Sequence, residues 1–315
     1  MPDRNKTELG ALVALFTGAM TIGAASILVR LSQTGPTATA FWRGCLALPL
    51  LGLWALLEPA SKRPPGDVPA RGASLRWVAA GLFFAADLAL WNWSLLLTSV
   101  AASTLEANLA PLFVTFFLWL FYRERPTARF IVATAFALGG MLLMVSPKFG
   151  QSGSAFVGDA LALGAAAFFG AYILAVASLR ARYGTGIVMF ISTLVFALAL
   201  LPLALTQKFV PDTLSGWATV AGCALAAQVF GQGLVAYALA HLRPTFGSLG
   251  LLVQTLGAAT AGWLVLGEHL SPIQIVGALV IVGAIALARS AGQAAKPGPE
   301  TQPAVPGESL GVLRD

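Results

Sequence analysis

Ten long apolar stretches, separated by shorter polar segments, dominate the hydrophobic pattern of the chain. Each holds about 20 mainly apolar residues, the length of helix that crosses the roughly 30 Å hydrocarbon core of a bilayer. Backbone groups left unpaired in lipid are costly, so stretches of this kind are expected to be membrane-spanning helices. The predicted helices cover residues 10–29, 37–57, 75–97, 100–122, 128–145, 157–179, 186–205, 214–240, 245–266 and 272–288.

The second half of the chain repeats the pattern of the first. The matched pairs are Trp119 with Trp263, Glu124 with Glu268 and Gly139 with Gly283 at a shift of 144 residues, and Gly35 with Gly184 at a shift of 149. A shorter polar segment in the second half, between the seventh and eighth stretches, explains the change in shift. Each half holds five predicted helices, an odd number, so the second half enters the membrane from the opposite side.

This arrangement predicts an all-α polytopic membrane protein made of two inverted five-helix repeats. The repeats are expected at 10–147 and 156–290, with tails at 1–9 and 291–315. The last tail is rich in Pro, Gly, Glu and Gln and lacks the apolar residues needed to pack, so we expect it to be disordered. Inverted repeats are frequent in secondary transporters, although a duplication can also simply enlarge a membrane scaffold.

Lys and Arg residues between the predicted helices indicate the orientation. With the N-terminus in the cytoplasm, fifteen of the 19 basic residues fall on the cytoplasmic side and three on the other side, while Arg43 lies within a stretch. Cytoplasmic loops are enriched in Lys and Arg. Both termini are therefore predicted to be cytoplasmic.

Composition agrees with a lipid environment and narrows the classes of function. Hydrophobic residues make up 57% of the chain and charged residues 10%, and the mean hydropathy is +0.81. Soluble domains carry about 25% charged residues, so the composition excludes a soluble enzyme, a nucleic-acid-binding protein and a disulfide scaffold. Cys45 and Cys223 lie in apolar stretches and are interpreted as core residues. We expect no cofactor and no metal, a small-molecule substrate and the bilayer as partners, and a monomer, with a homodimer left open.

Three charged residues lie well inside the predicted helices, away from their ends, and all belong to the first half: Arg43, Asp87 and Glu106. A charge at this depth is costly and normally faces a water-filled cavity or a partner. Arg43 and Glu106 each lie roughly 10 Å below the outer face, with Asp87 deeper. Arg43 and Glu106 could recognise the two ends of a zwitterion, or form a structural ion pair. A pair of Arg43 with Asp87 is a further arrangement.

Asp87 shares a helical stripe with Phe83 and Trp91. A carboxylate beside aromatic faces can hold a cationic amine by charge and by cation–π contact. The alternative is a buried, protonated acid that hydrogen-bonds to a neighbouring helix.

The remaining candidates for substrate binding are neutral or aromatic. In the second half, neutral polar side chains could supply hydrogen bonds opposite the acids, or could bond helix to helix. Aromatic side chains could stack on the substrate or serve as packing and interfacial anchors. The full set of neutral candidates is Trp42, Trp91, Asn92, Gln228, Gln232, Tyr237 and Gln254. Glu124 and Glu268, at equivalent helix ends, are predicted to stabilise tight turns or to act as symmetric gates.

Several short motifs together resemble the EamA-type members of the drug/metabolite transporter superfamily over about residues 9–290. These motifs are Trp42-Arg43, Pro111, Arg123-Glu124-Arg125, Gly158-Asp159 and Gly267-Glu268-His269. The resemblance implies a ten-helix exporter of the bacterial inner membrane, most similar to exporters of amino acids, including aromatic ones. One departure concerns the first predicted helix, which has no acid. The proton-exchanging glutamate of the related small multidrug transporters therefore has no counterpart there.

These observations predict a secondary transporter that exports neutral and aromatic amino acids and related small metabolites by alternating access. The alternative is an exporter of cationic drugs or other metabolites by proton antiport. A membrane enzyme is disfavoured because no intramembrane histidine and no second central aspartate accompany Asp87. A channel is disfavoured because the sequence lacks a carbonyl-filter motif and a ring-forming charge pattern.

Overall fold

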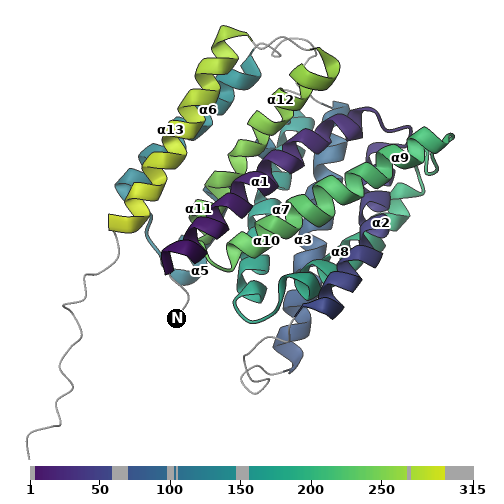
Figure 1. Cartoon of the computed structure of the whole chain (residues 1–315), viewed down its shortest axis with the longest axis horizontal. Coiled ribbons are helices and arrows are strands. Elements are labelled where there is room, and N and C mark those ends of the chain that lie inside the picture. The colour runs from purple at the N-terminus through teal and green to yellow at the C-terminus, as the bar shows by residue number, and fades with distance from the viewer. Residues whose placement is uncertain are drawn as a thin grey trace, which may run out of the picture.

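The computed structural model describes residues 4–58, 70–97, 103, 106–146, 156–267 and 271–294. Throughout these residues the regular structure is helical, with no strand (Figure 1). The helices of the first half are α1 (Arg4–Arg30), α2 (Pro36–Leu57), α3 (Ala70–Leu97), α5 (Ala110–Tyr122) and α6 (Ala128–Val145). Those of the second half are α7 (Phe156–Arg180), α8 (Thr185–Ala204), α9 (Leu214–Cys223), η3 (Ala224–Gln232), α10 (Gly233–Leu239), α11 (Pro244–Gly250), η4 (Leu251–Val253), α12 (Gln254–Leu266) and α13 (Pro272–Ala294).

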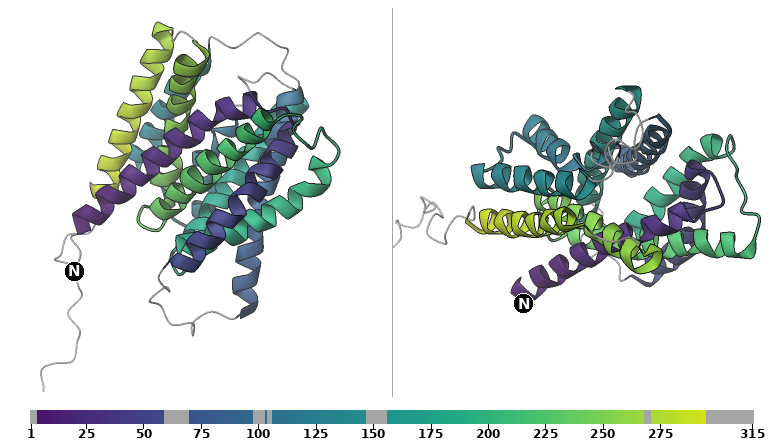
Figure 2. Two further views of the ribbon diagram at one scale, coloured as in Figure 1. Left: turned by 45° about the vertical axis from the view of Figure 1, so that its right-hand side comes forward. Right: turned by 90° about the horizontal axis from the view of Figure 1, so that it is seen from above.

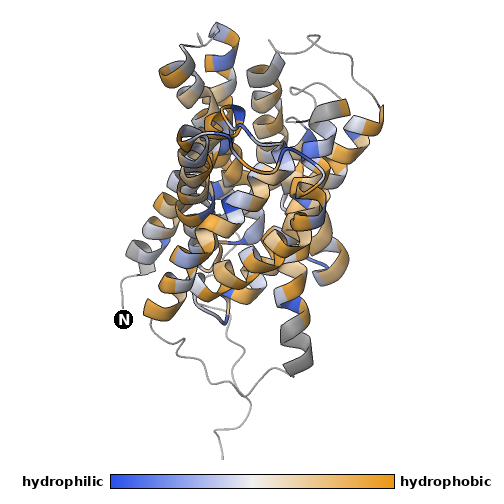
Figure 3. Cartoon of the chain, turned by 90° about the vertical axis from the view of Figure 1, so that its right-hand side faces the viewer, coloured by the Kyte–Doolittle hydropathy of each residue, from blue (hydrophilic) through white to orange (hydrophobic). Residues whose placement is uncertain are grey.

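The described helices overlap the predicted apolar stretches, but in the stretch 100–122 helix α5 begins only at Ala110. Among the described residues, seven helical segments are long and apolar enough to cross a membrane, and two shorter apolar helices lie at 110–122 and 128–143. Helix α3 covers the third predicted stretch. Many large apolar side chains are exposed, among them Leu56, Phe156 and Leu279 at 84%, 86% and 68%, and hydrophobic colours dominate the described helices in Figure 3. A surface of this kind suits contact with lipid.

Equivalent helices of the two halves begin at matching positions. Helices α3, α5 and α6 begin 144 residues before α9, α12 and α13, and α2 begins 149 residues before α8. Helices α5 and α12 also end alike, because Arg123 and Gly267 both adopt the left-handed conformation, with φ of 56° and 67°. The shifts found in the sequence are therefore present in the helix boundaries.

The two halves interleave through pairs of helices that obey the same correspondence. Helix α1 packs against α12, and its counterpart α7 packs against α5. Helix α3 packs against α7, while η3 and α10 pack against α1. The pairs α2·α8 and α6·α13 each join a helix to its own counterpart. In Figures 1 and 2 the α6·α13 pair lies along one edge of the bundle.

Glycines set the spacing of one of these pairs. At the α1·α12 crossing, a Cβ on Gly23 would overlap with the carbonyl of Gln254, and one on Gly257 would overlap with the backbone of Met20. At the counterpart α5·α7 crossing, a Cβ on Gly170 would lie 3.1 Å from that of Phe113. The α1·α12 backbones are thus in closer contact than those of α5·α7.

The eighth apolar stretch departs from regular α-helix. Its middle third, η3, is a π-helix. In the ninth stretch, η4 forms a short 3-10 segment before α12. The counterpart of η3 in the first half lies in α3, which is an uninterrupted α-helix. π-Helical segments are rare and frequently lie at functional sites.

Candidate functional site

Arg43 lies where α2 meets α3, α7 and α9. Its Cζ atom lies 5.5 Å from the centre of the Phe84 ring, a distance suited to a cation–π contact. The ionisable groups near enough to interact electrostatically with Arg43 are Cys223, Asp87 and Tyr172. The Nε atom is buried and has no hydrogen-bond partner among the described residues. A guanidinium with an unused N–H donor can donate a hydrogen bond to a carboxylate.

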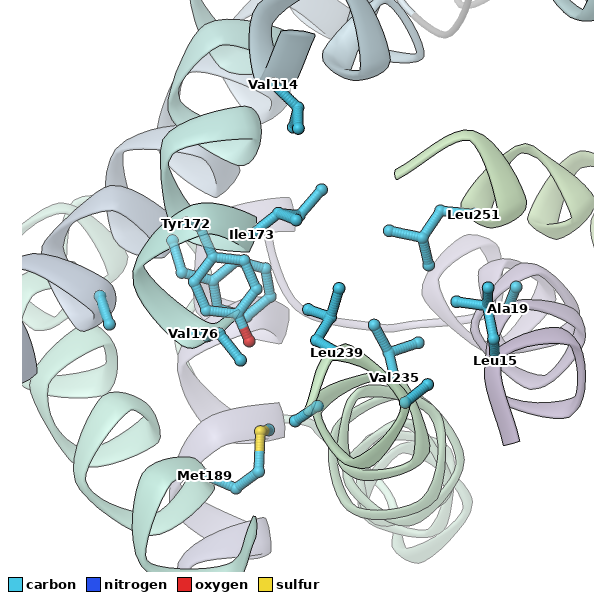
Figure 4. Close-up of a cluster of buried hydrophobic side chains, with 14 of the residues drawn as sticks. Leu15, Ala19, Val114, Tyr172, Ile173, Val176, Met189, Val235, Leu239 and Leu251 are labelled. Atoms are coloured by element: carbon cyan, nitrogen blue, oxygen red, sulfur yellow. The ribbon is translucent and has the colours of Figure 1, made fainter. Parts of the chain in front are cut away.

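Tyr172 of α7 forms the aromatic wall of this cluster. Its ring is 3% exposed and stacks on Phe84, with ring centres 4.5 Å apart and an angle of 16° between the planes. The hydroxyl donates to Oε1 of Gln232 at 3.5 Å. In Figure 4 this hydroxyl points towards Met189 of α8. The cluster therefore combines the charged Arg43 of the first half with the hydrogen-bonding side chains Tyr172 and Gln232 of the second.

Gln228 and Gln232 both lie in the π-helical segment. Gln228 is 1% exposed, and its Nε2 donates to Oγ1 of Thr193 on α8 at 2.8 Å. Its Oε1 is buried without a hydrogen-bond partner in the described part of the chain. Leaving a buried acceptor unpaired costs about 1–3 kcal/mol. A ligand donor could satisfy this oxygen.

Glu106 lies apart from Arg43. Within the described residues no ion pair joins the two, and the charge that acts on Glu106 is that of Asp159 at the start of α7. Its Oε2 atom is buried and has no partner among the described residues. Of the two acids considered as partners of Arg43, Asp87 is the one whose charge acts on the guanidinium.

Gln254 links the two repeats at the start of α12. Its Nε2 donates to Oδ1 of Asn108 at 2.9 Å. Asn108 is 8% exposed and lies just before α5. Gln254 is thus engaged in a contact between helices of different halves.

The aromatic candidates and Asn92 lie in several different places. Trp42 donates from Nε1 to the carbonyl of Phe209 at 2.7 Å, and its ring lies 4.9 Å from that of Trp217, near the start of α2. Trp91 is half-buried, and its carbonyl accepts from the Ser94 hydroxyl. Asn92 is 3% exposed, and its Nδ2 has no partner among the residues described. Tyr237 lies at the far end of α10, 4.8 Å from the ring of His241.

The two candidate gates lie at the ends of α5 and α12. Glu124 is exposed, and its backbone N–H donates to the carbonyl of Leu118 at 3.3 Å, which closes the end of α5. Glu268 lies outside the described residues. A role for either residue in gating stays a prediction.

Phe84 and Thr193 belong to the cluster but were not among the predicted site residues. Phe84 corresponds to Gln228 at the shift of 144 residues, so the internal repeat contains the signal that could have found it. Thr193 is 0% exposed and accepts the Gln228 amide. No sequence pattern distinguishes it from the other small residues of α8.

A separate hollow of about 230 Å³ lies nearer one end of the bundle. It is lined mainly by apolar side chains, with Ser178 of α7 among the polar ones. The lining residues are Leu118, Tyr122, Leu174, Ala177, Ser178, Leu239 and Pro244. Figure 4 shows the neighbouring apolar core, where Val114, Ile173, Leu239 and Leu251 from different helices face one another.

The interleaved apolar helices, the internal repeat and the buried polar cluster define a multi-pass helical membrane protein. The profile of the EamA-like transporter family matches this chain twice, at residues 6–146 and 156–290. The chain belongs to the EamA-like transporter family.

Among curated proteins, the chain is similar to the pseudopaline exporter CntI of two Pseudomonas aeruginosa strains, UCBPP-PA14 and PAO1. Both are 28% identical over 193 residues, which is 61% of this chain and 66% of the relative. The match therefore spans slightly less than two thirds of the relatives' length. The fold is also that of a protein solved by crystallography, with a TM-score of 0.71, 19% identity, and coverage of 90% of this chain and 98% of the other.

Proposed function

We propose that this protein exports amino acids, chiefly neutral and aromatic ones, and related small metabolites across the bacterial inner membrane. The proposed arrangement has ten membrane-spanning helices in two inverted repeats, with both termini in the cytoplasm. Membership of the EamA-like family and similarity to a pseudopaline exporter support export of a metabolite.

The single observation that carries the substrate class is the cluster around Arg43. It brings together a guanidinium, the Asp87 carboxylate and the stacked rings of Phe84 and Tyr172. An amino acid carries a carboxylate, an ammonium group and, in the aromatic cases, a flat apolar side chain. Arg43 would bind the carboxylate and Asp87 the ammonium group, while the rings would contact the side chain.

The helix pairing supports alternating access as the mechanism. The main contacts between the halves have counterparts, as α1·α12 has in α5·α7. In inverted-repeat transporters, two related halves can exchange conformations and so expose a site between them to each side in turn. The Arg43 cluster takes residues from both halves, which supports a site of this kind.

Flux into and out of proteoliposomes tests the function. Purified full-length protein is reconstituted, and uptake is measured for labelled neutral, aromatic and cationic amino acids, for pseudopaline and for a cationic dye, each with and without a pH gradient. We expect the fastest flux for aromatic and neutral amino acids. Flux of the dye alone, driven by a pH gradient, would instead establish the antiport of cationic drugs.

Substitutions in the cluster separate binding from structure. Asp87→Asn and Arg43→Lys should each reduce flux at low substrate concentration by at least tenfold, because either change removes a charge or the fork-shaped donor set of the guanidinium. Arg129→Gln, at the exposed start of α6, is the control and should leave flux unchanged. A loss of thermal stability without any change in substrate selectivity would assign Arg43 and Asp87 a structural role.

A further inference from the structure

A side chain at the end of α2 accepts hydrogen bonds from the start of α8. The carboxylate of Glu58, one residue past the end of α2, accepts from the backbone N–H of Thr185 at 2.7 Å and from that of Gly186 at 2.7 Å. These N–H groups belong to the first turn of α8, which has no intrahelical acceptor for them. The positive end of the helix dipole also favours the carboxylate. Glu58 is therefore a charged cap supplied by a different helix.

The opposite end of the same helix pair carries an equivalent contact. Gln207, three residues past the end of α8, accepts at Oε1 from the backbone N–H of Thr37 at 3.0 Å, and its Nε2 donates to the Thr37 hydroxyl at 3.2 Å. Thr37 lies in the first turn of α2. Gln207 is thus a neutral cap on α2.

The internal repeat relates these two contacts. Glu58 and Gln207 are 149 residues apart, as are Gly35 and Gly184, which precede the capped helices. A Cβ on Gly184 would overlap with the Glu58 carboxylate, and a Cβ on Gly35 would overlap with the Gln207 amide. Each glycine therefore provides the space that its cap occupies. We name the two contacts the Glu58 latch and the Gln207 latch.

The surroundings of the two latches also differ in charge. Arg180 at the end of α7 interacts with the charge of Glu58 and donates to the carbonyls of Ala236 and Tyr183. The Tyr183 ring in turn lies 4.7 Å from that of Trp77 on α3. At the Gln207 latch, the ion pair nearest in sequence joins Lys208 to Asp212, which lie in the same loop.

We infer that the two latches are the positioning elements that set which end of the transporter opens more readily, with the Glu58 end held more firmly than the Gln207 end. Charge-assisted hydrogen bonds are roughly twice as strong as neutral ones. The inference rests on the proposed function, because alternating access requires each end to open while the other stays closed. With the predicted orientation, the Glu58 latch lies at the cytoplasmic end.

Cysteine labelling reports opening of the Glu58 end without any substrate. Cys45 and Cys223 are replaced by alanine, and Ser178→Cys places the reporter in the hollow beside the end of α7. The rate of modification by a maleimide is then measured in full-length protein. Glu58→Gln should raise this rate about tenfold, because the amide oxygen keeps one weaker bond while the amide NH2 cannot accept from the second backbone N–H.

The substitution Gln207→Glu, at the other end of the helix pair, distinguishes coupled opening of the two ends from local helix capping. Gln207→Glu strengthens the distant latch and disfavours the state that is open at that end. Coupling between the ends should then raise the Ser178→Cys modification rate about twofold to threefold, although Gln207 is far from the reporter. Arg129→Gln, at the exposed start of α6, is the control and should leave the rate unchanged.

Two outcomes would overturn the inference. If the modification rate rises in Glu58→Gln but not in Gln207→Glu, the two contacts are only local helix caps. Unchanged rates in both variants would show that α2 and α8 stay joined at both ends. If Glu58→Gln fails to fold, Gln207→Glu tests the inference alone. Its carboxylate can accept from both the backbone N–H and the hydroxyl of Thr37, so both native contacts can be kept. Labelling needs no substrate. The expected changes in modification rate, together with an absence of amino-acid flux, would therefore refute the proposed substrate but not the role of the latches.

Discussion

The two halves of the molecule share a helix plan but differ in what they bring to its centre. The first half supplies Arg43 and Asp87, on the regular helices α2 and α3. The second half has Ser192 at the position equivalent to Arg43, and it supplies the neutral Gln228 and Gln232 from a π-helical segment. Repetition thus fixes the scaffold, while the chemistry of the site depends on the positions where the repeats differ.

The difference extends to the position shared by Phe84 and Gln228. In the first half, the aromatic ring lies against Arg43 and Tyr172. In the second half, the amide bonds to Thr193 and leaves its oxygen unpaired among the described residues. One position therefore provides an apolar ring in one half and a polar amide in the other, so the substrate proposed above would meet two different surfaces.

The largest expected effect comes from the two helix crossings. Gly23→Ala should lower the free energy of unfolding by about 3 kcal/mol, because the added methyl group meets the backbone of α12, which cannot rotate away. Gly170→Ala, at the counterpart crossing, should cost about 1 kcal/mol or less, because the nearest atoms, Cβ of Phe113 and the backbone N of Val114, lie at 3.1 and 3.2 Å and need to shift by only a few tenths of an ångström. Thermal unfolding in detergent measures both. Equal losses would show that the two crossings are equally tight.

The next effect concerns the charged position and its neutral counterpart. Arg43→Gln should cost about 1–2 kcal/mol, because Asp87 loses its compensating charge while it keeps some contact with solvent. Ser192→Ala removes one hydrogen bond to the Val188 carbonyl and should cost about 0.5 kcal/mol.

A double-mutant cycle with Asp87→Asn isolates the Arg43–Asp87 interaction. A coupling energy near zero would mean that the two charges act independently, and the contrast between the halves would then lie only in their side chains.

The smallest effect tests the π-helical segment. Gln228→Leu leaves the Thr193 hydroxyl without its donor but also removes an unpaired buried oxygen, so the net change in unfolding free energy should stay within about 1 kcal/mol. The same substitution should reduce flux if Gln228 contacts substrate. Thr193→Val is the matched variant, because it breaks the same hydrogen bond and leaves the amide in place. Equal flux in the two variants would assign their effect to the shared bond alone.

Much of the helical scaffold could be predicted from the sequence. An apolar stretch of sufficient length forms a helix almost regardless of its neighbours, so the stretch at 128–145 and α6 have the same limits. The repeat was equally accessible, because matched residues such as Trp119 and Trp263 reappear at the spacing of the helix ends.

The lateral arrangement of the helices could not be predicted in the same way. Hydrophobicity gives the length of each helix but not its rotation or neighbours, so the partner of Arg43 remained open between Asp87 and Glu106. Gln207 caps a helix that begins 171 residues earlier, and no local pattern indicates such a contact. The π-helix was missed for a related reason, because its residues are compatible with an ordinary α-helix.

The interleaved pairing also has a consequence for biosynthesis. The first half leaves the ribosome before most of its packing partners exist, since α1 must wait for α12 and α2 for α8. At 5–20 residues per second, roughly 10–45 s separate the end of α1 from the start of α12. During that interval the early helices present their small-residue faces to lipid or to the insertion machinery. Completion of the bundle is therefore a late event, and a chain truncated before α12 leaves α1 without its closest neighbour.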